Sequence, residues 1–70
     1  MIRVEKGADY VQGGDDRRHL LFIEEGELEN SETILGTQSA VYTAEREEIT
    51  FRAVTNWHGM LITLPSFLTN

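Results

Sequence analysis

Two histidines are the side chains in this sequence whose chemistry suits them to bind a metal ion or transfer a proton. His19 begins an apolar stretch, and His58 follows Trp57 late in the chain. Two imidazoles and one carboxylate are enough ligands for a divalent cation. The spacing of the histidines matches no metal-binding motif, so we expect structural or surface roles for both and predict no bound metal and no cofactor. The carboxylates that would complete such a site belong to Asp15, Asp16, Glu24 and Glu25.

Four side chains are the candidates for binding a small ligand. Trp57 and His58 are adjacent and offer a platform on which a flat ligand would stack, although we favour packing or a protein interface as the role of the tryptophan. Tyr42 and Arg52 are expected on neighbouring strands, where they would line the mouth of a small barrel. The Glu24–Glu25 pair is expected at a solvated turn, so we predict no catalytic residues.

The balance of charge disfavours nucleic acid as a partner. Asp and Glu number 12 against 6 Lys and Arg, which gives a net charge of −6, whereas nucleic-acid-binding proteins carry a clustered basic face. The Gly13–Gly14 pair precedes two aspartates that would repel phosphate, and no glycine-rich phosphate-binding motif surrounds it. We interpret the acidity as serving solubility. The alternative is an inhibitor that binds a basic site on another protein through Glu24–Glu29 and Glu45–Glu48.

The chain is too short to bury a large core. Its 70 residues are enough for one domain, and folding of such a domain buries only about 60% of the surface that the unfolded chain exposes. Small domains are commonly reinforced by disulfides, metals or oligomerisation, and cysteine is absent here. No apolar run approaches the ~20 residues that span a membrane, and Met1–Glu5 lacks the features of a signal peptide. We therefore expect an oligomer with a cytoplasmic location.

Short segments of alternating character, separated by turn residues, predict an all-β fold. The first, third and fifth residues of Ile49–Ala53 are apolar, which is the pattern of a half-buried strand. Thr55–Gly59 is expected to be a loop, and Pro65 to end the last strand. We predict a small barrel or sandwich of six to eight short antiparallel strands. This single domain is divided into N-terminal strands in 1–18, a main segment in 19–65 and a tail in 66–70.

Two of the predicted strands are apolar on both faces. Leu20–Ile23 has four apolar residues in succession, and Met60–Leu64 is apolar at nearly every position. One face of such a strand serves the core of its own domain, and the other face requires a second sheet or a partner chain. We therefore expect a homo-oligomer, in the simplest case a dimer, or contact with another protein. The interface residues that we predict are Leu21, Ile23, Leu61, Phe67 and Leu68.

The segment from His19 to Pro65 resembles the cupin superfamily. A cupin has an apolar strand leading into Glu-Gly-Glu-Leu-Glu, then a turn, a short strand ending in Gly, a strand with Ala-Val-Tyr and a strand with Phe-Arg-Ala. The segment is similar to metal-poor cupin domains such as the second half of pirin-like proteins, and it covers about two-thirds of the chain. The elements that carry the resemblance are Glu25–Glu29, Gly36, Ala40–Tyr42 and Phe51–Ala53.

The resemblance implies a minimal jelly roll without the metal that cupins usually hold. This chain has His19 where cupins have their glutamate ligand, Gly13–Asp15 where they have paired histidines, and Ile49 where they have the last histidine. Dimers are common in that family. The hypothesis we favour is a non-enzymatic cupin-like domain that binds a ligand or a protein as an oligomer. The alternatives are a small metal-dependent enzyme using His19 and His58, and the acidic inhibitor.

Overall fold

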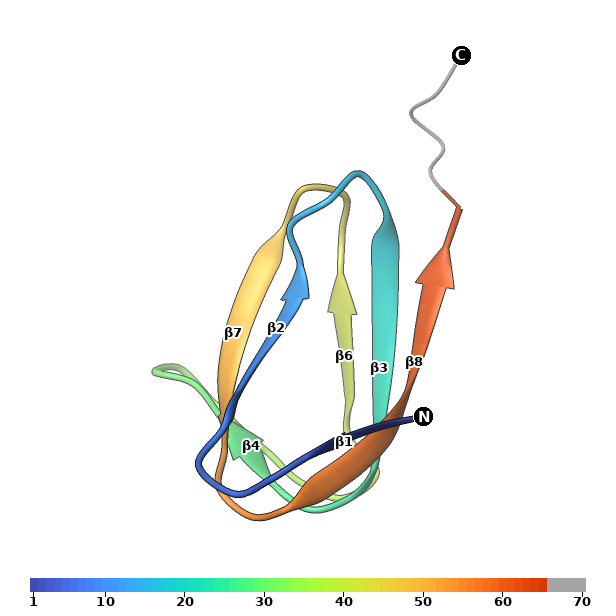
Figure 1. Cartoon of the computed structure of the whole chain (residues 1–70). Coiled ribbons are helices and arrows are strands. Elements are labelled where there is room, and N and C mark those ends of the chain that lie inside the picture. The colour runs from blue at the N-terminus through green and yellow to red at the C-terminus, as the bar shows by residue number, and fades with distance from the viewer. Residues whose placement is uncertain (66–70) are drawn as a thin grey trace.

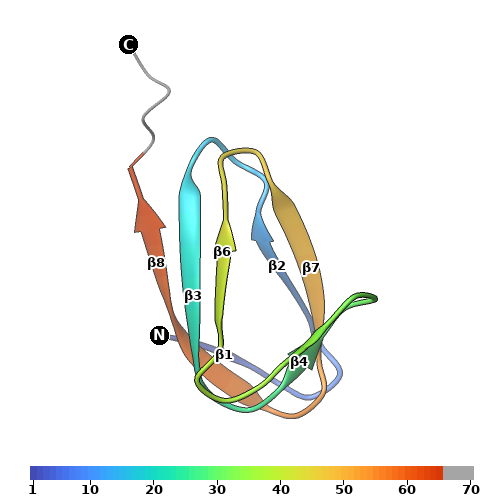
Figure 2. The ribbon, with the colours of Figure 1, turned by 180° about the vertical axis from the view of Figure 1, so that it is seen from behind.

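Eight short strands in two four-stranded sheets form the protein in the computed structural model, which describes residues 1–65 (Figures 1 and 2). Every strand pair is antiparallel, and the described residues contain no helix. Sheet A has the strand order β1-β8-β3-β6, and sheet B has the order β2-β7-β4-β5. The predicted all-β class is therefore confirmed. The strands are β1 (Ile2–Val4), β2 (Asp9–Gly13), β3 (Arg18–Glu25), β4 (Leu28–Glu29), β5 (Ile34–Leu35), β6 (Ala40–Thr43), β7 (Glu48–Ala53) and β8 (Trp57–Leu64).

The strand pairs are nested around the β4–β5 hairpin. β4 pairs with β5, β3 with β6, β2 with β7 and β1 with β8. The chain is thus one long hairpin, whose tip is stabilised by the Asn30 side chain accepting hydrogen bonds from the N–H groups of Glu32 and Thr33. Of the connections between described strands, all except β4–β5 pass from one sheet to the other. The β2–β7 pair therefore lies in one layer, with β3, β6 and β8 in the other (Figures 1 and 2).

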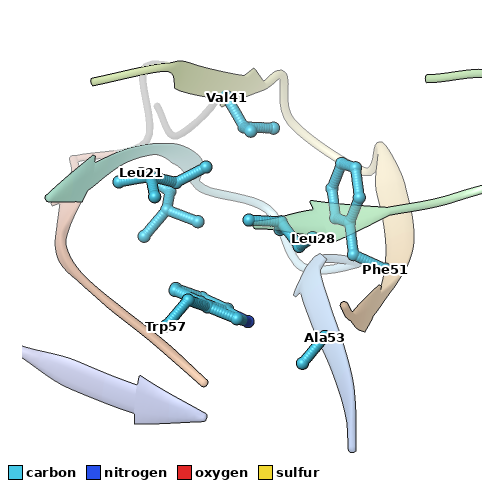
Figure 3. Packing of buried hydrophobic residues seen from close by; sticks show 7 residues of the cluster. Leu21, Leu28, Val41, Phe51, Ala53 and Trp57 are labelled. Atoms are coloured by element: carbon cyan, nitrogen blue, oxygen red, sulfur yellow. The ribbon is translucent and has the colours of Figure 1, made fainter. Parts of the chain in front are cut away.

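The core lies between the two sheets and is built from alternate positions of their strands (Figure 3). Phe51 and Ala53 of β7 are buried in it and Ile49 packs against it, as the alternation predicted. The Tyr10 ring meets Trp57 edge to face, with ring centres 5.2 Å apart, a favourable geometry for aromatic pairs. Burial of each large apolar side chain contributes about 1.5–3 kcal/mol. The buried core residues are Leu21, Ile23, Leu28, Val41, Phe51, Ala53 and Trp57.

The apolar run of β3 ends in a bulge and a turn that requires glycine. The register against β8 shifts between Ile23 and Glu25, and Gly26 follows with a φ of 111°. A Cβ atom on Gly26 would lie 2.4 Å from the Cβ of Trp57 and 2.5 Å from the carbonyl oxygen of Asn56. Only a residue without a side chain therefore allows the turn to pass this close to the start of β8.

The last strand begins earlier than we predicted. β8 starts at Trp57, so Trp57 and His58 are strand residues, and the loop predicted for Thr55–Gly59 is wrong in its second half. Gly59 pairs with Ile2 of β1 and with Ile23 of β3. A Cβ on this glycine would lie 2.4 Å from the Phe22 carbonyl oxygen. Close approach of neighbouring backbones explains the glycine here, where the sequence suggested a turn.

Candidate functional site

The outer face of sheet A is apolar and is not covered by any other part of the described chain. On this face Leu20 lies opposite Tyr42 and Ile62, and Phe22 lies opposite Ala40 and Met60. Four of these side chains keep large exposed fractions: 42% for Phe22, 51% for Tyr42, 48% for Met60 and 44% for Ile62. Contiguous exposed apolar surface of this kind marks interaction sites in soluble proteins. We define the apolar face as Leu20, Phe22, Ala40, Tyr42, Met60 and Ile62.

Sheet B has the usual arrangement of an antiparallel sheet, with one packed and one solvated face. Its outer face presents Asp9 opposite Arg52, and Thr50 on the central part of β7 is exposed. Two exposed apolar side chains, Val11 and Ile34, also lie there. They are on β2 and β5, the two opposite edges of the sheet, so they form no continuous patch. The apolar surface is therefore specific to sheet A.

Charged side chains border the apolar face at the two ends of β3. Arg18 lies at one end, where its Nε is 3.7 Å from a carboxylate oxygen of Glu45. Glu24 lies at the other end, and one of its carboxylate oxygens is buried without a hydrogen-bond partner among residues 1–65. The alternation of β3 around the buried Leu21 places Arg18 on the outer side, whereas Glu24 lies in the bulge between Ile23 and Glu25, where the alternation is interrupted. An apolar centre with charged ends is the common organisation of a protein interface.

The structure places the predicted interface residues mainly inside the domain. Leu21 and Ile23 are fully buried in the core, and Leu61 packs against it. These side chains therefore leave little surface for a partner, and the alternate residues of β3 and β8 occupy the outer face instead. The sequence could not distinguish the two sets because both are apolar. The remaining two predicted residues, Phe67 and Leu68, lie outside the described residues.

The four candidate ligand-binding residues are not brought together. Tyr42 is on the outer face of sheet A and Arg52 on that of sheet B, so the prediction that their strands are neighbours is wrong. Trp57 is only 2% exposed and belongs to the core, so it is no stacking platform. His58 is partly buried beside an open hollow of about 390 Å³. The hollow is lined by Arg3, Val4, Glu5, Glu25, Asn56, Trp57 and His58.

His19 is almost buried and has a partner at each ring nitrogen. Its Nδ1 lies 3.0 Å from Thr63 Oγ1, and its Nε2 lies 2.8 Å from Asp15 Oδ1. The same Asp15 oxygen accepts a hydrogen bond from the N–H of Arg17. The hydrogen bond from His19, followed by that from the Arg17 backbone, lowers the pKa of the Asp15 carboxyl. These contacts fasten the loop between β2 and β3 to sheet A, in agreement with a structural role for the histidine.

The two histidines lie at opposite ends of β3. His19 is level with Thr63, whereas His58 is level with Glu25. At the usual rise of a strand this separates them by about 20 Å, so they do not share a site. Within residues 1–65, no cluster of three or more His, Asp or Glu side chains is placed to hold a metal ion.

Gln12 of β2 connects sheet B to sheet A and was not identified from the sequence. Its Nε2 donates to the carbonyl oxygen of Val41 at 3.0 Å and to Thr43 Oγ1 at 3.2 Å. Its Oε1 accepts a hydrogen bond from the Tyr10 hydroxyl at 2.9 Å. Burial raises the pKa of Tyr10 to about 12. The position of Gln12 two residues after Tyr10 is the signal that would have placed it on the inner side.

Comparisons with known proteins identified no relative. No family model, curated protein sequence or solved structure matched the chain. In residues 1–65 no helix is long and apolar enough to cross a membrane.

Proposed function

We propose that this protein is a non-enzymatic interaction module, a cupin-like jelly roll that works as a homo-oligomer through the apolar face of sheet A. The observation that carries the proposal is the difference between the two sheets. Sheet B turns a polar outer face to solvent, whereas sheet A exposes large apolar side chains on three adjacent strands. The nested strand pairs in two four-stranded sheets support the jelly-roll part of the proposal.

The sequence pattern, apolar on both faces of β3 and β8, supports an interaction role for this surface. In Leu20–Ile23 the inner residues, Leu21 and Ile23, are buried in the core between the sheets, whereas Phe22 on the outer side is exposed. Leaving such side chains in water forgoes the free energy of burial, about 25 cal/mol for each Å² of apolar surface. A partner that covers the face recovers this free energy. The gain matters for this domain because a chain of this size buries only a small core of its own.

The dimensions of the apolar face indicate a reversible contact. Three strands spaced by ~4.8 Å, taken over the 4 residues of β6, offer a flat area of roughly 200 Å². Each partner in a complex of standard size contributes about 800 Å². We therefore expect a concentration-dependent dimer with a dissociation constant in the micromolar range rather than a permanent assembly.

The alternative functions draw less support from the geometry. A metal enzyme using His19 and His58 would need both imidazoles in one site, and they lie at opposite ends of β3. An acidic inhibitor would need a free cluster of carboxylates. Among its candidate carboxylates, however, Glu45 contacts Arg18, Glu47 accepts a hydrogen bond from the N–H of Ala44, and one oxygen of Glu24 is buried.

A pair of identical substitutions on the two outer faces tests the proposal. Ile62→Lys introduces a charge into the apolar face, and Ile34→Lys introduces the same charge on sheet B, where the isoleucine is 65% exposed. Sedimentation equilibrium and native mass spectrometry should show a wild-type dimer at about 100 μM, a monomeric Ile62→Lys variant and an unaffected Ile34→Lys variant. A wild-type protein that stays monomeric at millimolar concentration, or an equal effect of both variants, would overturn the proposal.

A further inference from the structure

The last strand of sheet A is longer than the strand that pairs with its outer edge. β8 pairs with β3 from His58 to Leu64, whereas β1 pairs only with Trp57, His58 and Gly59. Beyond Gly59 that edge of β8 has no neighbouring strand among residues 1–65, and in both views of the ribbon no strand lies outside this part of β8 (Figures 1 and 2). We define Met60–Leu64 as the open edge. An unpaired edge of this kind is a template for the addition of another strand.

The backbone of β3 shows which residues of β8 are bonded within the sheet. The N–H and the C=O of Ile23 both bond to residues just before β6, so they point away from β8. Because these groups alternate in direction along an antiparallel strand, Phe22 and Leu20 direct theirs toward β8. They lie opposite Met60 and Ile62, respectively. The backbone groups of Met60 and Ile62 are therefore bonded to β3.

The intervening residues, Leu61 and Thr63, direct their N–H and C=O groups outward. They follow Trp57 and Gly59 on the side of β8 where β1 lies, and β1 ends before it reaches them. No backbone group of residues 1–65 outside the strand ladders bonds to them either. The open edge thus presents two donors and two acceptors, in pairs spaced by ~6.8 Å, which is the repeat of an antiparallel partner strand.

A second copy of β8 is a poor occupant of this edge. Twofold pairing of Leu61 with Thr63 of the other copy would bring Pro65 level with Gly59 of that copy, a place that its β1 already fills. Pairing Thr63 with Thr63 instead would set Pro65 opposite Leu61. Proline has no N–H, so the Leu61 carbonyl would lack a donor in both copies. The geometry therefore favours a separate extended segment, short enough to lie between β1 and Pro65.

The surroundings of the open edge define the chemistry of such a segment. Met60 and Ile62 belong to the apolar face, so residues of an added strand that lie opposite them should be apolar and β-branched. The residues opposite Leu61 and Thr63 project to the other side of the sheet, where Thr63 contacts His19 and a small polar side chain is suitable. The net charge of −6 favours a segment that carries basic residues.

We infer that the open edge binds an extended basic segment of another protein, which joins sheet A as an antiparallel strand through the backbone groups of Leu61 and Thr63. Addition of a strand to an exposed sheet edge is a recurring mode of peptide recognition, in which the backbone provides affinity and alternate side chains provide specificity. The inference goes beyond the proposed function and does not depend on it, because the oligomer uses the outer face of sheet A rather than its edge.

Amide hydrogen exchange followed by NMR tests whether the edge is open. In the protein without peptide, the amides of Leu61 and Thr63 should exchange at least about tenfold faster than those of Met60 and Ile62, which are bonded to β3. Slow exchange at all four positions would mean that the edge is already covered, and it would overturn the inference.

A short designed peptide tests binding. The probe is the acetylated and amidated heptapeptide Lys-Val-Thr-Val-Thr-Val-Lys, whose two threonines can lie opposite Leu61 and Thr63. NMR titration should give a dissociation constant of about 0.1–1 mM, and the bound peptide should slow the exchange of both amides about tenfold at saturation. Absence of binding at about 5 mM peptide would overturn the inference.

N-methylated forms of the same peptide separate strand addition from apolar contact. Methylation of both threonine nitrogens removes the N–H groups that would face β8 and should weaken binding at least about tenfold. Methylation of the two outer valine nitrogens removes N–H groups that would face solvent and should change binding less than about threefold. Equal effects of the two modifications would show that the peptide does not add as a strand.

Two substitutions of Thr63 provide the matching control in the protein. Thr63→Pro and Thr63→Val both lose the hydroxyl that contacts His19, but only the proline variant loses the outward N–H. An edge strand tolerates proline where the N–H is not bonded in the sheet, and circular dichroism melts check that both variants fold. Thr63→Val should bind the peptide within about threefold of the wild type, and Thr63→Pro at least about tenfold more weakly.

The outcomes distinguish this inference from the proposed function. Equal binding by the two folded Thr63 variants overturns the inference and leaves the proposed function intact. If Thr63→Pro does not fold, the N-methylated peptides decide the matter with the wild-type protein. A wild type that stays monomeric refutes the proposed function and leaves strand addition at the open edge standing.

Discussion

Replacing Gln12 should reveal how much of the stability depends on one polar contact between the sheets. Gln12→Leu retains most of the side-chain volume but removes the amide that bonds Val41, Thr43 and Tyr10. The Val41 carbonyl can only accept, so it loses its donor outright. Each such bond contributes about 1 kcal/mol net, and an acceptor left unsatisfied in a buried position costs about 1–3 kcal/mol.

The expected loss is a large part of the total stability. Summing these effects gives a decrease of about 2–4 kcal/mol in the free energy of unfolding. A domain of this length is stable by only about 4–10 kcal/mol, and its melting temperature falls by about 7 °C for each kcal/mol. We therefore expect the melting temperature of Gln12→Leu to lie about 15–25 °C below that of the wild type. Val11→Leu, at the exposed neighbouring position, should change stability by less than about 0.5 kcal/mol.

A second substitution at this position places a titratable group in the same contact. Gln12→Glu has the same shape, but an ionised carboxylate would set an acceptor against the Val41 carbonyl oxygen. Burial and this repulsion raise the pKa of the new carboxyl above its ordinary value of about 4.3. A raised pKa in the folded state means that the stability deficit is largest near pH 7 and shrinks as the pH falls and the carboxyl becomes a donor. Thermal melts of variant and wild type at pH 7, 5.5 and 4 measure this difference. A deficit that is the same at all three pH values, or a Gln12→Leu variant as stable as the wild type, would refute the cross-sheet role.

Two further predictions concern the loops at the ends of the sandwich. The pKa of Asp15 is lowered in the folded protein, so its contribution to stability is present above about pH 4 and is lost as the pH falls through the folded pKa. In thermal melts, Asp15→Asn should therefore be less stable than the wild type at pH 7 and equally stable at pH 2–3. The control variant Asp16→Asn should change stability little at either pH. Gly26→Ala should cost more than about 3 kcal/mol in chemical denaturation, because its Cβ would collide with the backbone of Trp57, whereas Gly7→Ala, with a φ of 87° and open space around it, should cost only about 1 kcal/mol.

The strand pattern was readable from the sequence because alternation reports which side of a strand is buried. Ile49–Ala53 shows this clearly: its apolar positions lie inward in β7. Leu20–Ile23 has no such alternation. A run that is apolar at every position predicts that both faces are covered, but it does not show which face packs in the core of the same chain. Leu21 and Ile23 were therefore predicted at the interface, whereas they are buried in the core.

The candidate sites were less predictable because they depend on contacts between distant segments. Tyr42 and Arg52 lie on consecutive strands, which in a simple meander would pair, but here the connection between them crosses to the other sheet. The partner of His19 at Nδ1, Thr63, comes from the far end of the chain. Local composition contains no information on either arrangement, since both follow from the nested pairing of the strands.

The nested pairing also determines the order in which the chain can close. The Asn30–Thr33 tip joins residues that are near neighbours in sequence, whereas Ile2 of β1 must find Gly59 of β8. The entropy cost of closing a loop grows with its length, so each inner pair that forms shortens the loop for the next pair outward. We expect the strand pairs to form in order from the β4–β5 hairpin outward to the β1–β8 pair. The three-residue β1 would then be the last strand to join and the first to leave, which makes the amino-terminal edge of sheet A the place where the native molecule opens.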